Sequence, residues 1–218
     1  MKNIFTYVFL IPSLLSVLNV HAQKGLSLNL KASPQFSFLF NENNEHNKKY
    51  DRKATFRAGF GLGAEYGFNT HMGVGLDVYY SLQGQRYKFD NKEYNQRLDY
   101  IKIPILFTYQ SNVLKPVSLI GRVGPQLSIL TAAQLKDDEG LNLPGGSESR
   151  FESTTFGGVA AVGAQFKLNR RSYLTSSVRF DYDFTNAEDD TYPGYNQARE
   201  KTHSSTLGLE VGFRYLLN

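Results

Sequence analysis

Residues 54–68 read ATFRAGFGLGAEYGF, and this stretch decides the fold because its residues alternate in character. Phe56 and Leu62 fall on one side of an extended chain, whereas Arg57 and Glu65 fall on the other side together with glycines. Successive side chains of a β-strand point to opposite faces, so the period of two predicts a strand with one apolar and one polar face.

The same alternation recurs along the rest of the chain and predicts eight strands. They span residues 25–40, 54–68, 72–85, 98–109, 117–131, 154–168, 173–184 and 206–217. None of the residues that define their apolar faces carries a charge, whereas the opposite faces carry many. A charge that faces lipid near the middle of a bilayer costs about 2–4 kcal/mol, so a membrane would impose this segregation. A soluble β-sandwich also alternates, and alternation alone does not decide between the two. Pro34, Pro104 and Pro125 lie inside the predicted strands and predict bulges, because proline donates no ladder hydrogen bond.

The lengths of the predicted connections favour the membrane barrel. Long connections (41–53, 86–97, 132–153 and 185–205) alternate with short ones (69–71, 110–116 and 169–172). Long extracellular loops and short periplasmic turns are typical of outer-membrane barrels, and a sandwich has no reason to sort its loops in this way. The sequence therefore predicts an all-β fold, an eight-stranded antiparallel up-and-down transmembrane β-barrel in the bacterial outer membrane. An even number of strands places both termini in the periplasm.

The N-terminal residues have the pattern of a secretory signal peptide. Lys2 supplies a positive charge, residues 4–20 are mostly apolar, and a small residue, Ala22, precedes Gln23. We expect residues 1–22 to be a cleavable signal peptide and residues 23–218 to form the outer-membrane β-barrel domain. The alternative is an uncleaved membrane anchor, for which the stretch is short and lacks a basic stop-transfer flank.

Composition excludes other classes of protein. The chain is 41% hydrophobic, yet no internal run reaches the roughly 18 apolar residues of a spanning helix. There is no Cys, so no disulfide holds the fold, and the net charge of +4 does not suggest nucleic-acid binding.

Three segments resemble a known family. Residues 100–106, YIKIPIL, resemble the Y-L-E-I-P-L-L strand of PorT-type outer-membrane β-barrel proteins, and residues 121–127, GRVGPQL, are similar to the strand that follows it. Residues 178–182, VRFDY, resemble the R-Y-x-Y penultimate strand of that family. The resemblance covers nearly all of the mature chain and implies a small eight-stranded barrel. Lys102 stands where the family often has Glu, which implies a rearranged interior. The founding member is linked to a protein-secretion apparatus, but most relatives have no assigned function, so the resemblance implies a type of barrel and not a task.

The polar faces predict a filled interior, since an eight-stranded barrel is just wide enough for its own side chains. Eight charged residues point inward in this register: Glu65, Asp77, Lys102, Arg122, Arg179, Asp181, Glu210 and Arg214. Opposite charges in such numbers favour mutual neutralisation, so we expect a structural ion-pair network and no general pore. The alternative is a narrow ion pathway, a proton-linked site or a small-solute channel.

An outer-membrane enzyme that acts on lipid or peptide through its loops is a second class of function. His71 falls in a predicted short turn, and His46 and His203 fall in long loops, the latter beside Ser204 and Ser205. Loop histidines are usually only solvated, so we expect no catalytic residue and no enzyme. The chain has no Cys/His metal spacing, and its glycine-rich stretches do not open helices, so we expect no metal and no cofactor.

A binding module is the third class. The predicted first long loop carries a basic cluster, Lys48, Lys49, Arg52 and Lys53, which we expect to meet lipopolysaccharide phosphates or the acidic residues 188–190 of the last loop. The expected partners are outer-membrane lipid, lipopolysaccharide and, during biogenesis, the barrel-assembly machinery. A protein partner stays open.

Overall fold

Eight long strands form the wall of the molecule, as the alternation of the sequence predicts. The computed structural model describes residues 25–40, 51–89, 92–111, 115–137, 141–143, 150–191 and 201–217. The long strands are β1 (Gly25–Phe40), β2 (Asp51–Gly67), β3 (Met72–Phe89), β4 (Lys92–Gln110), β5 (Val117–Lys136), β7 (Thr154–Lys167), β8 (Ser172–Asp183) and β9 (His203–Leu216). A two-residue strand, β6 (Asn142–Leu143), pairs with the end of β5.

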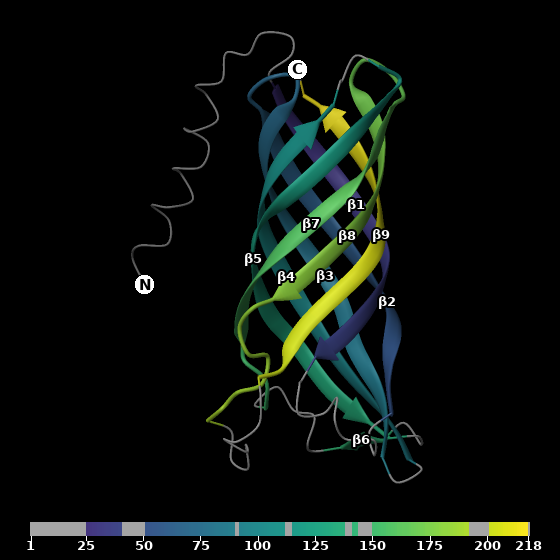
Figure 1. Cartoon of the computed structure of the whole chain (residues 1–218), viewed down its shortest axis with the longest axis vertical. Coiled ribbons are helices and arrows are strands. Elements are labelled where there is room, and N and C mark those ends of the chain that lie inside the picture. The colour runs from purple at the N-terminus through teal and green to yellow at the C-terminus, as the bar shows by residue number, and fades with distance from the viewer. Residues whose placement is uncertain are drawn as a thin grey trace, which may run out of the picture.

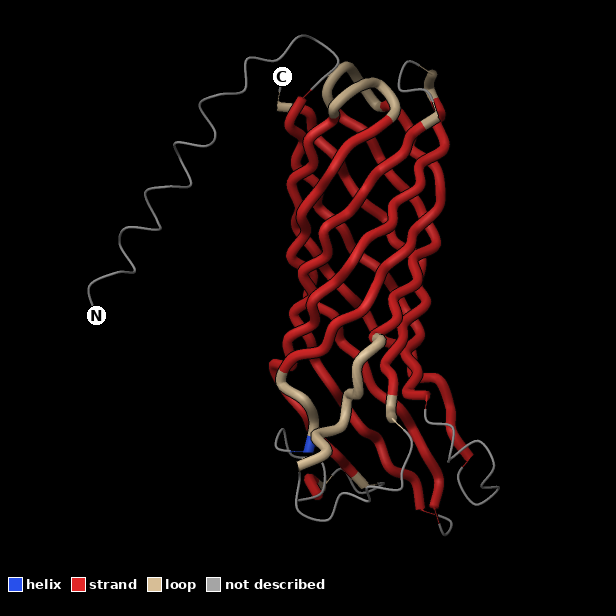
Figure 2. The backbone as a smooth tube through the Cα atoms, turned by 60° about the vertical axis from the view of Figure 1, so that its left-hand side comes forward, coloured by secondary structure: helices blue, strands red, loops and turns tan. Residues whose placement is uncertain are grey.

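The sheet closes on itself into a barrel. Every neighbouring pair is antiparallel, and the first and last strands pair from Ser27 with Leu216 to Phe40 with His203. The additional pairing of β4 with β5 completes the ring. The strands tilt around a long axis, with short turns at the end where the C-terminus lies and the longer connections at the other end (Figures 1 and 2). The predicted fold class is confirmed.

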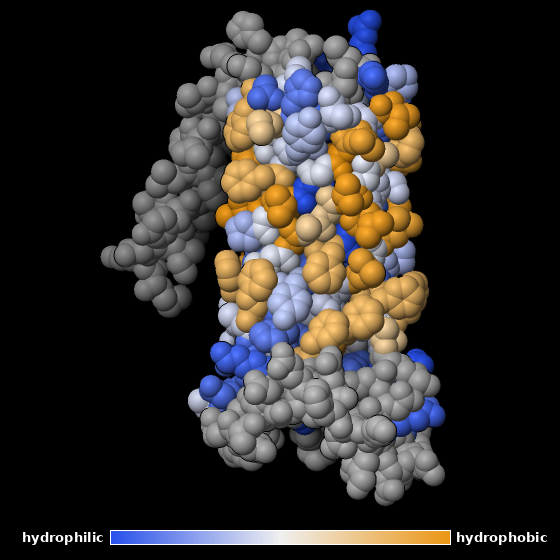
Figure 3. Space-filling model, viewed as in Figure 1, coloured by the Kyte–Doolittle hydropathy of each residue, from blue (hydrophilic) through white to orange (hydrophobic). Residues whose placement is uncertain are grey.

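The two faces of the wall differ as the sequence predicts. Polar side chains on the inner face are buried, whereas large apolar side chains on the outer face are exposed. The outer residues come from every long strand and include Leu30, Phe60, Val78, Ile105, Val123, Val162, Val178 and Leu209. On the visible side of the molecule, hydrophobic residues cover the middle of the barrel, and hydrophilic residues gather toward its ends (Figure 3). No helix in the described part of the chain is long and apolar enough to cross a membrane.

The predicted bulges at the prolines are wrong. Pro34, Pro104 and Pro125 each pair across a strand, with Ala58, Gln126 and Gly158 respectively, and the register is the same before and after each of them. The shifts in register occur instead between Ala54 and Gly59 on β2 and between Asp99 and Tyr100 on β4.

The structure also corrects the predicted second long loop. Residues 86–97 belong mostly to β3 and β4, which continue as a hairpin in which Arg86 pairs with Asn95 and Lys88 with Glu93. The strands β2 and β5 extend in the same way, to Asp51 and Lys136. Beyond the membrane the outer face of a strand is solvated and can carry charges, so the alternation of hydropathy stops although the backbone pairing continues. We call these extensions of β2–β5, past the last pair of β5 with β7, the raised rim.

Candidate functional site

The eight charged residues predicted to line the lumen all lie on the inner face. They come from β2 (Glu65), β3 (Asp77), β4 (Lys102), β5 (Arg122), β8 (Arg179 and Asp181) and β9 (Glu210 and Arg214). Each is at least nine-tenths buried. The barrel fold therefore brings together charges that are far apart in the sequence.

Glu210 is at the centre of the lumen contacts. One carboxylate oxygen accepts a hydrogen bond from Arg122 at 3.0 Å, and the other accepts one from Arg179 at 3.1 Å. Arg179 also donates to both oxygens of Asp181, at 2.8 and 3.0 Å, and the ammonium of Lys102 lies 3.8 Å from the same carboxylate. These contacts thus link the neighbouring strands β4 and β5 with the neighbouring strands β8 and β9 through the lumen.

A second group of contacts lies closer to the short turns. Arg214 forms an ion pair with Glu65 at 3.0 Å, and Thr108 donates to the other oxygen of that carboxylate at 3.0 Å. Arg122 lies 3.9 Å from Glu65 and so connects this group with Glu210. The guanidinium of Arg214 also donates to Ser27, Gln110 and Gln165, at 3.0, 3.2 and 3.3 Å.

Lys31 is an interior charge that the sequence reasoning missed. It lies on the polar face of β1 and pairs with Asp77 of β3, although β2 separates the two strands. The missing side chain of Gly63 makes this possible, since a Cβ there would overlap the Asp77 carboxylate. The polar-face position of Lys31 was a usable signal, but its partner depends on the register of three strands.

The ring of Tyr79 fills another space left by glycines. It lies over Gly59 and Gly61 on β2, where an added Cβ would come within 2.4 Å of its atoms. The guanidinium of Arg179 lies 4.4 Å from the centre of the same ring, so the tyrosine face also contacts the central cation.

An apolar cluster covers the loop end of the lumen. Leu98, Tyr100, Ala133 and Phe151 are buried together, and Leu39 and Leu130 pack against them. We call these six residues the mouth cluster. Phe151 belongs to the segment between β6 and β7, whose backbone is held by bonds from Leu130 to Ser153 (2.9 Å) and from Glu152 to Ala187 (3.0 Å).

The described lumen residues are balanced in charge. Five bases (Lys31, Lys102, Arg122, Arg179 and Arg214) lie among five acids (Glu65, Asp77, Asp181, Asp183 and Glu210). Asp183 accepts a hydrogen bond from Ser128 at 3.1 Å. Charges that are buried and paired in this way neutralise each other and hold the strands together, and they leave little attraction for an ion of either sign.

Comparison with known proteins gives the family. The sequence model of the outer membrane protein beta-barrel domain matches residues 11–216. The chain belongs to this family. It is a β-barrel of the bacterial outer membrane.

Solved outer-membrane barrels have the same fold. A major outer membrane protein from Thermus thermophilus is 15% identical, with a TM-score of 0.53, and the match covers 90% of this chain and 100% of that one. The outer membrane protein OprG from Pseudomonas aeruginosa is 13% identical, with a TM-score of 0.51 and coverage of 90% and 97%. Identities this low show the fold alone. No curated protein matches the sequence significantly.

Two histidines of this outer-membrane barrel lie in its described part, His71 and His203, and neither forms a hydrogen bond with a described serine. His203 contacts the backbone oxygen of Asp183 at 3.0 Å and stacks on Tyr182, whereas the hydroxyl of Ser204 donates to Gln83. His71 lies in a short turn, where it contacts Thr70 at 2.8 Å. His46 lies outside the described residues.

An acidic cluster at the loop end was not predicted from the sequence. Carboxylate oxygens of Glu152, Asp189 and Asp190 lie within 4.8 Å of one another. Burial, and then the charges of the two aspartates, raise the pKa of Glu152, whereas hydrogen bonds from Thr191 lower the pKa of Asp189. Within the described residues this is the group whose geometry could hold a metal ion, but exposed acidic groups alone do not make a metal site.

The basic cluster predicted to meet lipopolysaccharide is divided by the structure. Lys48 and Lys49 lie outside the described residues, whereas Arg52 and Lys53 belong to β2 and pair with Tyr87 and Arg86. The prediction that Arg52 and Lys53 lie in a loop is therefore wrong, because β2 continues into the raised rim.

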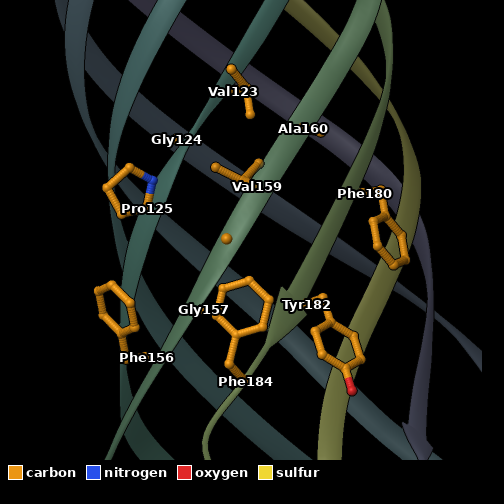
Figure 4. A pocket seen from close by; sticks show the side chains of 11 residues that line it. Val123, Gly124, Pro125, Phe156, Gly157, Val159, Ala160, Phe180, Tyr182 and Phe184 are labelled. Carbon is orange, nitrogen blue, oxygen red and sulfur yellow. The ribbon is translucent and has the colours of Figure 1, made fainter.

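A groove of about 510 Å³ lies on the outer wall, across β5, β7 and β8. Two residues with little or no side chain leave the groove hollow. Gly158 lies between Pro125 and Tyr182, and Ala160 lies between Val123 and Phe180. Aromatic rings of Phe156, Phe180, Tyr182 and Phe184 surround it (Figure 4). The groove is apolar and opens on the outer wall of the barrel.

Proposed function

We propose that this outer-membrane barrel has a structural or interaction role and is not a general pore. The observation that carries the proposal is the filled lumen: Glu210, Arg122 and Arg179 meet at its centre, and the mouth cluster covers its loop end. A solute that crossed would have to separate buried ion pairs, and the removal of one partner from such a pair costs about 3–5 kcal/mol.

Planar bilayer recordings at neutral pH test the proposal. A shift in gel migration between unboiled and boiled samples first establishes that the inserted protein is a folded barrel. We then expect no stable single-channel conductance, while a porin in the same bilayers conducts. Stable conductance steps from the folded protein would overturn the proposal in favour of a small-solute channel.

We further propose that the barrel belongs to the PorT-type subgroup and works within an envelope or secretion assembly. The resemblance of residues 100–106, 121–127 and 178–182 supports the subgroup, and the role in an assembly is the part that the next experiment tests. Crosslinking in cells followed by purification from detergent should recover a defined envelope protein. A known envelope complex that is crosslinked in the same cells serves as the control. If that complex is recovered but this barrel is recovered alone, a stand-alone structural role is favoured.

We propose that residues 1–22 are cleaved and that both termini face the periplasm. The barrel begins at Gly25, close after the proposed cleavage site, and the first residues of β1 and the last residues of β9 lie at the short-turn end (Figure 1). N-terminal sequencing of protein from the outer-membrane fraction should begin at Gln23. Epitope tags placed at 138–140 and at the C-terminus should be accessible on intact cells only at the former position.

Lipopolysaccharide contact by Lys48, Lys49, Arg52 and Lys53 also stays a proposal, supported by their charge and by the place of β2 at the loop end. Neutralising all four should weaken lipopolysaccharide retention at low salt, since such contacts are screened. Unaltered retention would leave them as solvated residues. We propose no enzymatic role. We therefore expect that a strain that lacks this protein has unchanged lipid A.

A further inference from the structure

Three arginines from neighbouring strands meet on the outer wall at the base of the raised rim. Arg57 of β2 reaches across β3 and donates to the side chain of Asn95 on β4 at 3.1 Å. Asn95 is the pairing partner of Arg86, and the next residue on the same face, Gly84, pairs with Arg97. These three guanidinium groups, from Arg57, Arg86 and Arg97, are called the arginine cluster below.

The Arg57 side chain passes close to Gly84. A Cβ at Gly84 would lie 3.4 Å from Nη2 of Arg57, so the Arg57 side chain occupies the space above the glycine. Residues paired across antiparallel strands share a face, as do residues two apart along a strand. Arg86, Gly84 and Arg97 therefore lie on the face that also carries the exposed ring of Tyr80. Arg57 pairs with the lumen residue Gln35 on β1, so the alternation predicts that it faces the lumen, and that prediction is wrong. It lies in the register shift between Ala54 and Gly59, where its side chain turns to the outer face and meets Asn95. The arginine cluster is therefore on the outside of the barrel.

The cluster carries three positive charges, and its contacts identify one carboxylate beside them, that of Asp99. Asp99 is buried and accepts two hydrogen bonds from Arg97, at 2.6 and 3.0 Å, and one from Tyr80 at 3.3 Å. The negative charge of Asp99 also attracts the guanidinium of Arg57, whereas the positive charges of Arg97 and Arg86 repel it. The buried Nε of Arg57 has no hydrogen-bond partner among the described residues. Arg57 and Arg97 thus share one carboxylate, and like charges as close as those of the cluster repel each other unless an anion joins them.

The position of the cluster indicates which anion that is. On β2 the neighbouring outer residue is Phe56, which is 62% exposed, and on β3 and β4 the outer face continues toward the barrel centre with Tyr80, Val78 and Ile105. The arginines thus follow directly after the last exposed apolar side chains. In a bilayer this is the level of the headgroups, where aromatic girdles also lie. Guanidinium groups match phosphate oxygens in geometry and bind them with charge-assisted hydrogen bonds.

We propose that Arg57, Arg86 and Arg97 form a site for the phosphate group of a lipid in the leaflet at the loop end of the barrel, the phosphate of lipid A in the outer leaflet. Arg57 and Arg86 donate to the phosphate, and Asp99 orients Arg97 beside it. The inference rests on the proposed orientation with the loops outside, and it is independent of whether the lumen conducts. It adds a site on the wall to the proposed contacts of Lys48, Lys49, Arg52 and Lys53.

The test compares lipid A binding by two variants of the folded full-length barrel. Arg57→Gln with Arg86→Gln removes two charges from the site and leaves the Arg97–Asp99 pair intact. Arg170→Gln with Arg171→Gln removes the same charge from exposed positions in a short turn at the opposite end. Binding of bisphosphorylated lipid A is measured by native mass spectrometry in detergent, with phosphatidylcholine and lipid A freed of phosphate as comparison lipids.

We expect the wild type and the turn variant to bind lipid A equally, and the wall variant to bind it at least about tenfold more weakly, since each lost charge-assisted bond contributes about that factor. Phosphate-free lipid A should bind all three proteins as weakly as lipid A binds the wall variant. Equal binding of lipid A to the folded wall variant, or undiminished binding of phosphate-free lipid A to the wild type, would overturn the site. Displacement of lipid A by inorganic phosphate at equal concentration would instead identify a site for the free anion, which also overturns the proposal. Conductance recorded on the same preparations reports separately on the sealed lumen.

Discussion

Glu65 on β2 and Arg214 on β9 form an ion pair of 3.0 Å through the lumen, although β1 separates their strands in the sheet. Both side chains are nearly fully buried. The pair shows how the interior of this barrel holds the wall together: polar side chains connect strands that share no backbone hydrogen bond.

Replacing Glu65 with Gln should destabilise the barrel strongly. The change keeps the shape of the side chain but leaves the Arg214 guanidinium buried without its carboxylate, and loss of one partner of a buried pair costs about 3–5 kcal/mol. Urea titration of folding into lipid vesicles measures the difference. Glu93→Gln is the control, since its pair with Lys88 is half exposed and contributes only about 0–1 kcal/mol. Equal midpoints for the two variants would show that the lumen pair does not support the fold.

The pair of Lys31 and Asp77 should respond to single and double replacement in opposite ways. Lys31→Met leaves a buried carboxylate unpaired and should lower the urea midpoint. Adding Asp77→Leu removes that charge as well, and apolar replacement of a whole buried pair is often neutral or stabilising. The double variant should therefore recover most of the loss. A double variant weaker than the single one would show that other lumen charges depend on this pair.

Valine at Gly61 should distort the centre of the lumen. Its Cβ would lie 2.4 Å from the Tyr79 ring, which would have to leave its position against Arg179. Overpacking of this kind costs about 1–3 kcal/mol. Gly121→Ala is the control, because nothing lies within 4 Å of the added Cβ. Both variants are compared by thermal shift in gel migration, and a Gly61→Val barrel as stable as the control would contradict the assigned packing of Tyr79.

Truncation of Phe151 should open the mouth cluster without creating a pore. Phe151→Ala removes the ring that packs with Leu98, Tyr100 and Ala133, and a buried Phe to Ala change costs about 3–5 kcal/mol where the site cannot collapse. Amide exchange of Glu152, which donates to Ala187, should accelerate. Conductance should stay absent, because the ion pairs below are untouched. Channel activity in this variant would show that the mouth cluster alone seals the lumen.

The loop segment that contains Glu152 should weaken as pH rises. Its raised pKa means that the folded state favours the protonated carboxyl, so the stabilisation is complete below the ordinary pKa of glutamate, about 4.3, and is lost as pH rises through the raised value. Exchange of the Ala187 amide, which donates to Thr202 at 2.8 Å, reports on this segment after correction for intrinsic rates. Glu152→Gln should remove this pH dependence, and Glu93→Gln should leave it unchanged. An identical pH profile in the Glu152→Gln protein would assign the effect to other groups.

The sequence by itself determined which residues face lipid and which face the lumen. The period of two in segments such as 54–68 assigns most side chains to a face, and a membrane forbids charge on one of them, so strand number and the inward position of Glu65 or Arg214 follow without knowledge of neighbours. Arg57 is an exception, because it lies in the register shift of β2 and meets Asn95 on the outer wall. The alternation of apolar and polar residues ends where the strands leave the membrane. It therefore could not detect that Arg86 and Asn95 continue as paired strands in the raised rim.

Only the tertiary structure decided the partners. Lys31 meets Asp77, and Arg57 meets Asn95, because the registers of three consecutive strands align. For Lys31 and Asp77, Gly63 also leaves room between them. A strand register depends on backbone pairing along the whole interface, and a shift of two residues keeps every side chain on its face while it exchanges every contact. The face on which a side chain lies is thus mostly a local property of the sequence. The ion pairs, the mouth cluster and the arginine cluster depend instead on how the strands pair around the barrel.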